Sequence, residues 1–114
     1  MGTVDDPEKA DGLVKALERM WVKFLPEIRE RVAVLESAAA AFAAHALTAT
    51  QQEAAHAAAH KLAGVLGTFN LAHGTILARE LELLYSGENG PDLALGSRLA
   101  ALAAELRATV ESRG

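Results

Sequence analysis

One pattern in this sequence is better suited to chemistry than any other. It consists of two histidines, a glutamate and two glycines. Glu53, His56, His60, Gly64 and Gly67 are spaced by three or four residues, so in an α-helix they would lie along one line. Imidazole and carboxylate groups on one helix face can transfer protons, ligate a metal ion or act as nucleophiles. We call these five residues the His60 face and expect it to be exposed and to contact a partner.

The helix that would carry the His60 face has its apolar residues on the opposite side. Those apolar positions are Ala55, Ala58, Leu62, Leu66 (or Val65) and Phe69. Each glycine in a helix interior costs about 1 kcal/mol relative to alanine, and glycines that point outward do not serve the core. They either leave space for a partner, flanked by the short side chains of Ala57 and Ala63, or are tolerated defects in an alanine-rich surface helix.

Local signals predict where this helix and the later helices begin and end. Thr50 and Glu53 have the spacing of a capping box at a helix start. Asn70 tolerates a left-handed conformation and is expected to end the helix. A third helix is expected over about residues 71–85. After a glycine-rich loop, Pro91 is predicted to take the first position of the last helix.

The N-terminal part of the sequence has an apolar residue at every seventh position. These residues are Val14, Trp21, Ile28, Leu35 and Phe42. The repeat predicts a helical face from about residue 7 to about residue 44, with Asp6 as its N-cap. Pro26 falls opposite this seam, so we expect one long kinked helix or two nearly collinear helices. Such a helix is too long for its partners, and its first turns should overhang the fold or cover one end.

Composition favours a single all-α domain. The chain has 114 residues, of which 51% are hydrophobic and 23% charged, as in soluble globular proteins. Alanine and leucine dominate the apolar half, with only seven valines and two isoleucines, which favours helices over strands. We expect an up-down antiparallel four-helix bundle over residues 21–114. Residues 1–20 would form a tail and a helical extension.

The same composition excludes several kinds of function. Without cysteine there can be no disulfide scaffold, thiol nucleophile or thiolate zinc site. The net charge of −4 and the lack of a basic stripe argue against nucleic-acid binding. No apolar run is long enough to cross a bilayer and no signal peptide is recognisable. We therefore expect no membrane contact and a cytoplasmic location.

The segment from His60 to Leu71, HKLAGVLGTFNL, resembles the signature of histidine-containing phosphotransfer (HPt) domains. The family pattern is a histidine, a hydrophobic residue two positions later, a Lys-Gly pair, and small residues that lead into the next helix. The resemblance extends from about Trp21 to the C-terminus. It departs at Ala63, where the family often has lysine, and Lys61 is the nearest cation in the sequence. Whether this change weakens phosphotransfer is left open.

The resemblance implies a phosphocarrier without independent catalytic turnover. His60 would accept a phosphoryl group from the aspartyl phosphate of a receiver domain, or from a kinase branch, and pass it to another receiver. Glu82 is implied as the partner of the other ring nitrogen, and Lys61 as a contact for the phosphoryl group or the partner. The expected partners are response-regulator receiver domains, a hybrid histidine kinase, or both. Mg²⁺ is expected on the receiver, with no cofactor on this chain.

Two other functions remain open at this point. Glu53, His56 and His60 share a face and could ligate zinc, although the His-Glu-x-x-His order is absent. Alternatively the bundle could be a helical scaffold that pairs through its alanine-rich face or its long first helix. We expect a monomer, with a homodimer as the other possibility. His45 and His73 are interpreted as ordinary surface residues.

Overall fold

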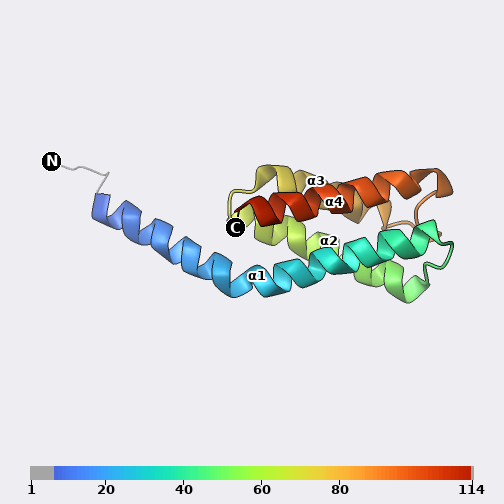
Figure 1. The fold of residues 1–114 in the computed structure, drawn as a ribbon, viewed down its shortest axis with the longest axis horizontal. Helices are drawn as coiled ribbons and strands as arrows, with labels where there is room; N and C mark the ends of the chain where they lie inside the picture. Colours follow the sequence, from blue (N-terminus) through green and yellow to red (C-terminus); the bar gives the residue numbers. More distant parts are fainter. Residues whose placement is uncertain (1–6, 114) are drawn as a thin grey trace.

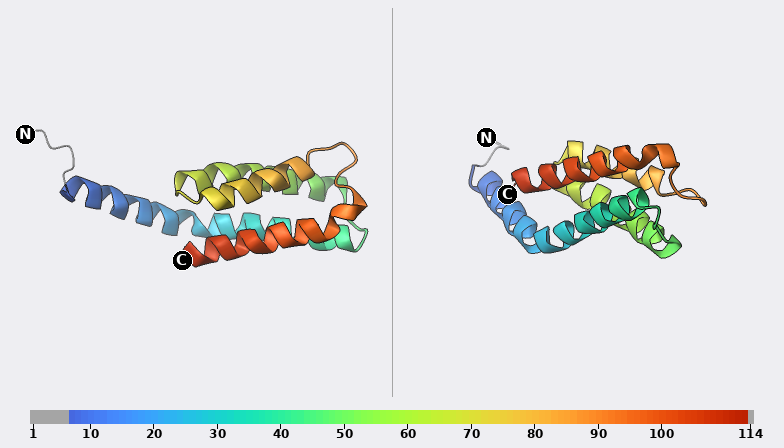
Figure 2. Two further views of the ribbon diagram at one scale, coloured as in Figure 1. Left: turned by 90° about the horizontal axis from the view of Figure 1, so that it is seen from above. Right: turned by 45° about the vertical axis from the view of Figure 1, so that its right-hand side comes forward.

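The computed structural model describes residues 7–113, and in this range it is all-helical with no strand (Figure 1). The elements are α1 (Pro7–Ala43), α2 (Ala49–Thr68), α3 (Ala72–Leu84), the short 3₁₀ turn η1 (Leu93–Leu95) and α4 (Gly96–Arg113). The four α-helices run alternately up and down, and short connections join their ends (Figures 1 and 2). The expected antiparallel four-helix bundle is therefore confirmed.

Helix α1 is one continuous helix that is longer than the bundle. Its N-terminal part projects beyond the other helices and bends where it joins them (Figures 1 and 2). Leu13 and Val14 on the projecting part are 64% and 57% exposed, whereas Trp21 is buried. Pro26 lies inside the helix and is exposed, as expected for a proline on the outer side of a kink. The overhang is thus confirmed, and the predicted Asp6 cap lies outside the described residues.

The core is made of apolar side chains from all four helices. Its largest fully buried side chains, in chain order, are Trp21, Ile28, Val32, Leu35, Leu62, Leu66, Leu81, Tyr85, Leu99, Leu102, Leu106 and Val110. Trp21 and Phe69 pack edge to face with ring centroids 5.2 Å apart, a favoured aromatic geometry. No polar or charged residue of the described part is buried. The heptad seam of α1 is therefore its core face once the helix enters the bundle.

The start of α2 differs from the sequence prediction. Its N-cap is Thr48, with Oγ1 accepting from the Gln51 amide at 3.1 Å and Gln51 Oε1 accepting from the Thr48 amide at 2.8 Å. The predicted Thr50–Glu53 box is therefore wrong. The same reciprocal chemistry is available two residues earlier, and using it leaves Glu53 on the exposed face of a longer helix.

The end of α2 follows the prediction, whereas the start of α4 does not. Asn70 has a φ of 59° and its amide donates to the Gly67 carbonyl, as in a helix-ending left-handed turn. Pro91 does not open α4: it is buried before Asp92, which caps η1 through a 3.2 Å bond from the Ala94 amide. An aspartate carboxylate satisfies free helix-start amides directly, so the turn starts there, and α4 follows from Gly96.

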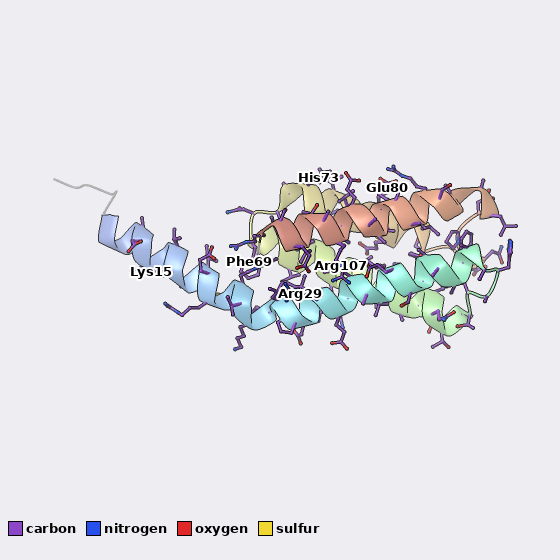
Figure 3. All side chains as sticks on the ribbon, viewed as in Figure 1. Lys15, Arg29, Phe69, His73, Glu80 and Arg107 are labelled. Carbon is purple, nitrogen blue, oxygen red and sulfur yellow. The ribbon has the colours of Figure 1, made fainter. Side chains whose placement is uncertain are left out.

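Ion pairs join α4 to its neighbours on the outside of the bundle. Arg107 contacts Glu36 of α1 at 2.6 Å and Arg29 of α1 contacts Glu111 at 2.8 Å; Figure 3 shows both arginines between these helices. The Arg29 guanidinium lowers the pKa of the Glu111 carboxyl through its hydrogen bonds. Exposed pairs of this kind add little stability each, so the apolar core does most to fix the relative positions of the helices.

Candidate functional site

The His60 face lies on the outer surface of α2, as the spacing predicted. Glu53, His60, Gly64 and Gly67 are exposed and His56 is half-buried. The other side of the helix carries the fully buried core leucines. The five residues therefore form one continuous surface line on a helix that is fixed by the core.

The two glycines of this face are not required by packing within the domain. A Cβ atom built at Gly64 would meet no other group within 4 Å, and one at Gly67 would only touch Thr75 Oγ1 at 3.6 Å. Both positions could therefore hold alanine, which would favour the helix by about 1 kcal/mol. No contact among the described residues explains the two glycines. They therefore serve a partner or have no structural role.

His60 is paired with a carboxylate of α3. Its Nδ1 lies 2.7 Å from Oε2 of Glu82, and the side chains are 70% and 21% exposed respectively. Because an ionised carboxylate can only accept a hydrogen bond, Nδ1 carries the proton in this contact. The Nε2 atom of a neutral ring then has its lone pair free. The geometry thus holds the ring in one orientation on an exposed part of the surface.

Lys61 and Ala63 differ in their positions relative to this face. Lys61 is exposed. Ala63 was expected beside the partner surface, but it is 3% exposed and belongs to the core. Helix α3 covers it, and Thr75 Oγ1 donates to the Ala63 carbonyl at 3.2 Å. The assignment of Ala63 to the partner-binding surface is therefore wrong.

Two hollows are lined by His56, and one of them is also lined by Glu82. One, of about 350 Å³, is lined by His56, Arg79, Glu82, Leu83 and Ser86. The other, of about 310 Å³, is also lined by His56 and lies between the start of α2 and the end of α3. Arg79 and Leu83 were not identified from the sequence. They lie within three residues of Glu82, and only the packing of α3 on α2 shows that they border this site.

The remaining histidines are on other parts of the surface. His73 Nε2 lies 3.2 Å from Glu105 Oε1 and its side chain is 61% exposed; Figure 3 labels it on the outer side of α3. His73 is therefore a surface residue with a carboxylate partner of its own. His45 is exposed in the turn after α1, with a φ of 56°. Neither belongs to the His60 face.

A metal-binding arrangement is not present in the part of the chain that the structure describes. Within residues 7–113 no group of three or more His, Cys, Asp or Glu side chains is placed to hold a metal ion. Glu53, His56 and His60 share a helix face, but their side chains are not arranged to ligate one metal ion. Among the same residues, no helix is both long enough and apolar enough to span a membrane.

The sequence of this helical bundle matches one known domain family. The Hpt domain model matches residues 19–112, which is most of the chain, and the chain therefore belongs to the Hpt domain family. Hpt domains are helical phosphocarrier modules that act in histidine phosphotransfer within two-component phosphorelays, where they interact with receiver domains and histidine kinases. Comparisons with curated proteins and with solved structures gave no match.

Proposed function

We propose that His60 is the phosphoryl acceptor and donor of this domain, and that its Nε2 atom is the nucleophile. The observation that carries the proposal is the 2.7 Å contact between His60 Nδ1 and Glu82 Oε2 on a ring that is 70% exposed. This contact selects one tautomer and leaves the opposite nitrogen free on the outer surface of a rigid helix. No other described histidine combines this pairing with the glycines of the His60 face.

The transfer step is a direct displacement at phosphorus. The Nε2 lone pair attacks the phosphorus of a receiver aspartyl phosphate, the N–P bond forms, and the P–O bond to aspartate breaks. The bonding electrons leave with the aspartate carboxylate. The ring keeps its Nδ1 proton and becomes a phosphorylated imidazolium, whose positive charge lies against Glu82. Transfer onward to a second receiver is the reverse step, and each step depends mainly on positioning and charge stabilisation.

The partner would dock on the His60 face. Glu53, His56, Gly64 and Gly67 border the nucleophile along α2, and Lys61 is exposed beside it. The low surface at the glycines would let a receiver bring its aspartyl phosphate close to Nε2. The receiver would supply Mg²⁺ at the phosphoryl group, and this chain would need no cofactor. Receiver domains, a hybrid histidine kinase, or both are the proposed partners.

Chemical phosphorylation of the purified chain tests this proposal without a partner. The chain is incubated with phosphoramidate, and intact mass together with acid lability identifies phosphohistidine. The expected result is one acid-labile phosphoryl group on the wild type and none on His60→Gln. His73→Gln is the matched control, because it removes another exposed histidine that has a carboxylate partner. It should load like the wild type.

Either of two results would overturn the proposal. Equal loading of the wild type and His60→Gln would place the phosphoryl group on another residue. No loading of the wild type by phosphoramidate or by a phosphorylated receiver would refute phosphotransfer, and zinc titration and sedimentation would then test the metal and scaffold alternatives.

A phosphorylated receiver is added in a second experiment to determine whether transfer requires the residues of the His60 face.

A further inference from the structure

Two carboxylates lie on the surface where His60 would receive the phosphoryl group. Glu82 lies 2.7 Å from the ring, and Glu53 is exposed on the same face. A transferring phosphoryl group adds negative charge on its equatorial oxygens. Stabilising that charge requires hydrogen-bond donors or cations aimed at the place where it develops. Two cations of the described residues lie near the site: Lys61 follows His60 on α2, and Arg79 on α3 lines a hollow with Glu82.

Arg79 differs from the arginines that join the helices. Arg29, Arg98, Arg107 and Arg113 each lie within 3.0 Å of a carboxylate oxygen on another helix. Within residues 10–113, whose side chains the structure describes, Arg79 forms no ion pair. It is exposed. Its guanidinium is thus free to bind an anion, and holding the bundle together does not require it.

The packing of α3 on α2 places Arg79 in one hollow with His56 and with Glu82, the partner of His60. Arg79 follows Thr75 by four residues and precedes Glu82 by three, so the three lie on one face of α3. Thr75 contacts the Ala63 carbonyl and Glu82 contacts His60. Arg79 lies between these two contacts, about 4.5 Å along the helix axis from Glu82. It also lines the 350 Å³ hollow together with Glu82.

Lys61 is less well placed for the same task. Successive residues turn by about 100° around a helix, so Lys61 and Ala63 lie on opposite sides of His60. Ala63 is on the side that α3 covers. Lys61 therefore points away from α3, where the Glu82 contact holds the ring. A guanidinium also offers several donors in one plane and suits phosphoryl oxygens better than a single ammonium group does.

We propose that Arg79 is the residue of this chain that contacts the phosphoryl group on His60. This inference rests on the proposed function of His60. The guanidinium donates N–H bonds to the equatorial oxygens while phosphorus moves from the aspartate oxygen to Nε2. Arg79 neither gains nor loses a proton, and the N–P and P–O bonds change as described above. A cation from α3 thus acts at a nucleophile carried by α2.

The test measures phosphorylation of the full chain by phosphoramidate, so that no partner surface is involved. Arg79→Ala should load about tenfold more slowly than the wild type, and Arg79→Lys should recover part of the rate. Arg19→Ala is the matched control, because Arg19 is also exposed, forms no ion pair within residues 10–113 and lies on the overhang of α1. Arg19→Ala should load within about twofold of the wild type, and Lys61→Ala should lose less than Arg79→Ala.

A second measurement separates contact with the phosphoryl group from a structural effect. Titration of phosphohistidine by ³¹P NMR gives the pKa of the phosphoryl group, which a neighbouring cation lowers. That pKa should be higher by about half a unit in Arg79→Ala and unchanged in Arg19→Ala. Circular dichroism checks that each variant is folded, and Arg79→Gln replaces Arg79→Ala if the latter is not.

The outcomes distinguish this inference from the proposed function. If the wild type does not load, both are refuted. If the wild type loads on His60 but Arg79→Ala matches it in rate and in phosphoryl pKa, only the role of Arg79 is refuted. If Lys61→Ala carries the whole loss, the contact belongs to α2 and the inference is overturned. A loss in Arg79→Ala with both readouts changed, and with Arg19→Ala unaffected, supports it.

Discussion

Replacing Gly64 by alanine should stabilise the free domain. Gly64 is inside the 20-residue helix α2, and a Cβ atom there would meet no other group within 4 Å. The change therefore adds no clash and recovers the helix preference of alanine over glycine, about 1 kcal/mol. For a domain of this size that corresponds to a rise in Tm of about 4 °C. Thermal and urea unfolding followed by circular dichroism measure it.

The same position should show the opposite effect when a receiver must dock. Gly64 follows His60 by four residues on the same face, so a longer side chain there would stand between the nucleophile and an approaching protein. Gly64→Gln should slow transfer from a phosphorylated receiver about tenfold. This factor corresponds to a loss of about 1.4 kcal/mol in the free energy of docking. Loading by phosphoramidate, which is small, should stay within about twofold of the wild type.

Gly12 supplies the matched control for the docking effect. It is an exposed helical glycine on the overhang of α1, and a Cβ atom there would also meet nothing within 4 Å. Gly12→Gln should not change transfer from the receiver. If Gly64→Ala lowers Tm, the reasoning about packing is wrong. If Gly64→Gln accepts the phosphoryl group from the receiver at the wild-type rate, the glycines do not serve docking.

Two further predictions concern Glu82 and Tyr85. Glu82→Ala should slow phosphoramidate loading about tenfold because the ring loses its oriented partner, and Glu82→Gln should lose less; equal rates for all three proteins would contradict the role of the contact. Tyr85→Phe should stabilise the fold by about 1 kcal/mol, since the buried hydroxyl has no hydrogen-bond partner among the described residues. Burial raises the Tyr85 pKa from 10.0 to about 12, so the native state holds this proton longer than the unfolded chain and stability falls as pH rises from 10 to 12. Urea unfolding across that range should show a smaller fall for Tyr85→Phe, and identical pH profiles would contradict the assignment.

Much of the fold could be predicted because it depends on periodicity. The seven-residue spacing from Trp21 to Phe42 fixes which face of α1 is buried, and Pro26 does not disturb that face because it points outward. Helix ends were less predictable. Thr48 and Thr50 each have a suitable partner three residues later, and the sequence alone does not determine which pair forms. Pro91 fitted a helix start equally well on local chemistry, but Asp92 provides the cap instead.

The site could be predicted only as far as one helix determines it. The spacing along α2 placed His60 and the glycines on one exposed face, and the family resemblance pointed to Glu82. Ala63 was misplaced because its exposure depends on α3, which covers that side of α2. Arg79 was missed for the same reason. Its place in one hollow with His56 and Glu82 follows from the antiparallel packing of two helices, which no pattern within either helix contains.

The arrangement explains how a small bundle can hold a reactive group without a pocket that encloses it. Helix α2 carries His60, the proposed nucleophile, and the core leucines fix the position of this helix. Helix α3 supplies Glu82, which orients the ring, and Arg79, the cation that we infer for the phosphoryl group. Because these contributions come from different helices, a change in their packing would separate the oriented ring from its cation. A core substitution under this site, such as Leu81→Ala, should therefore slow phosphoramidate loading even at temperatures where the domain remains folded.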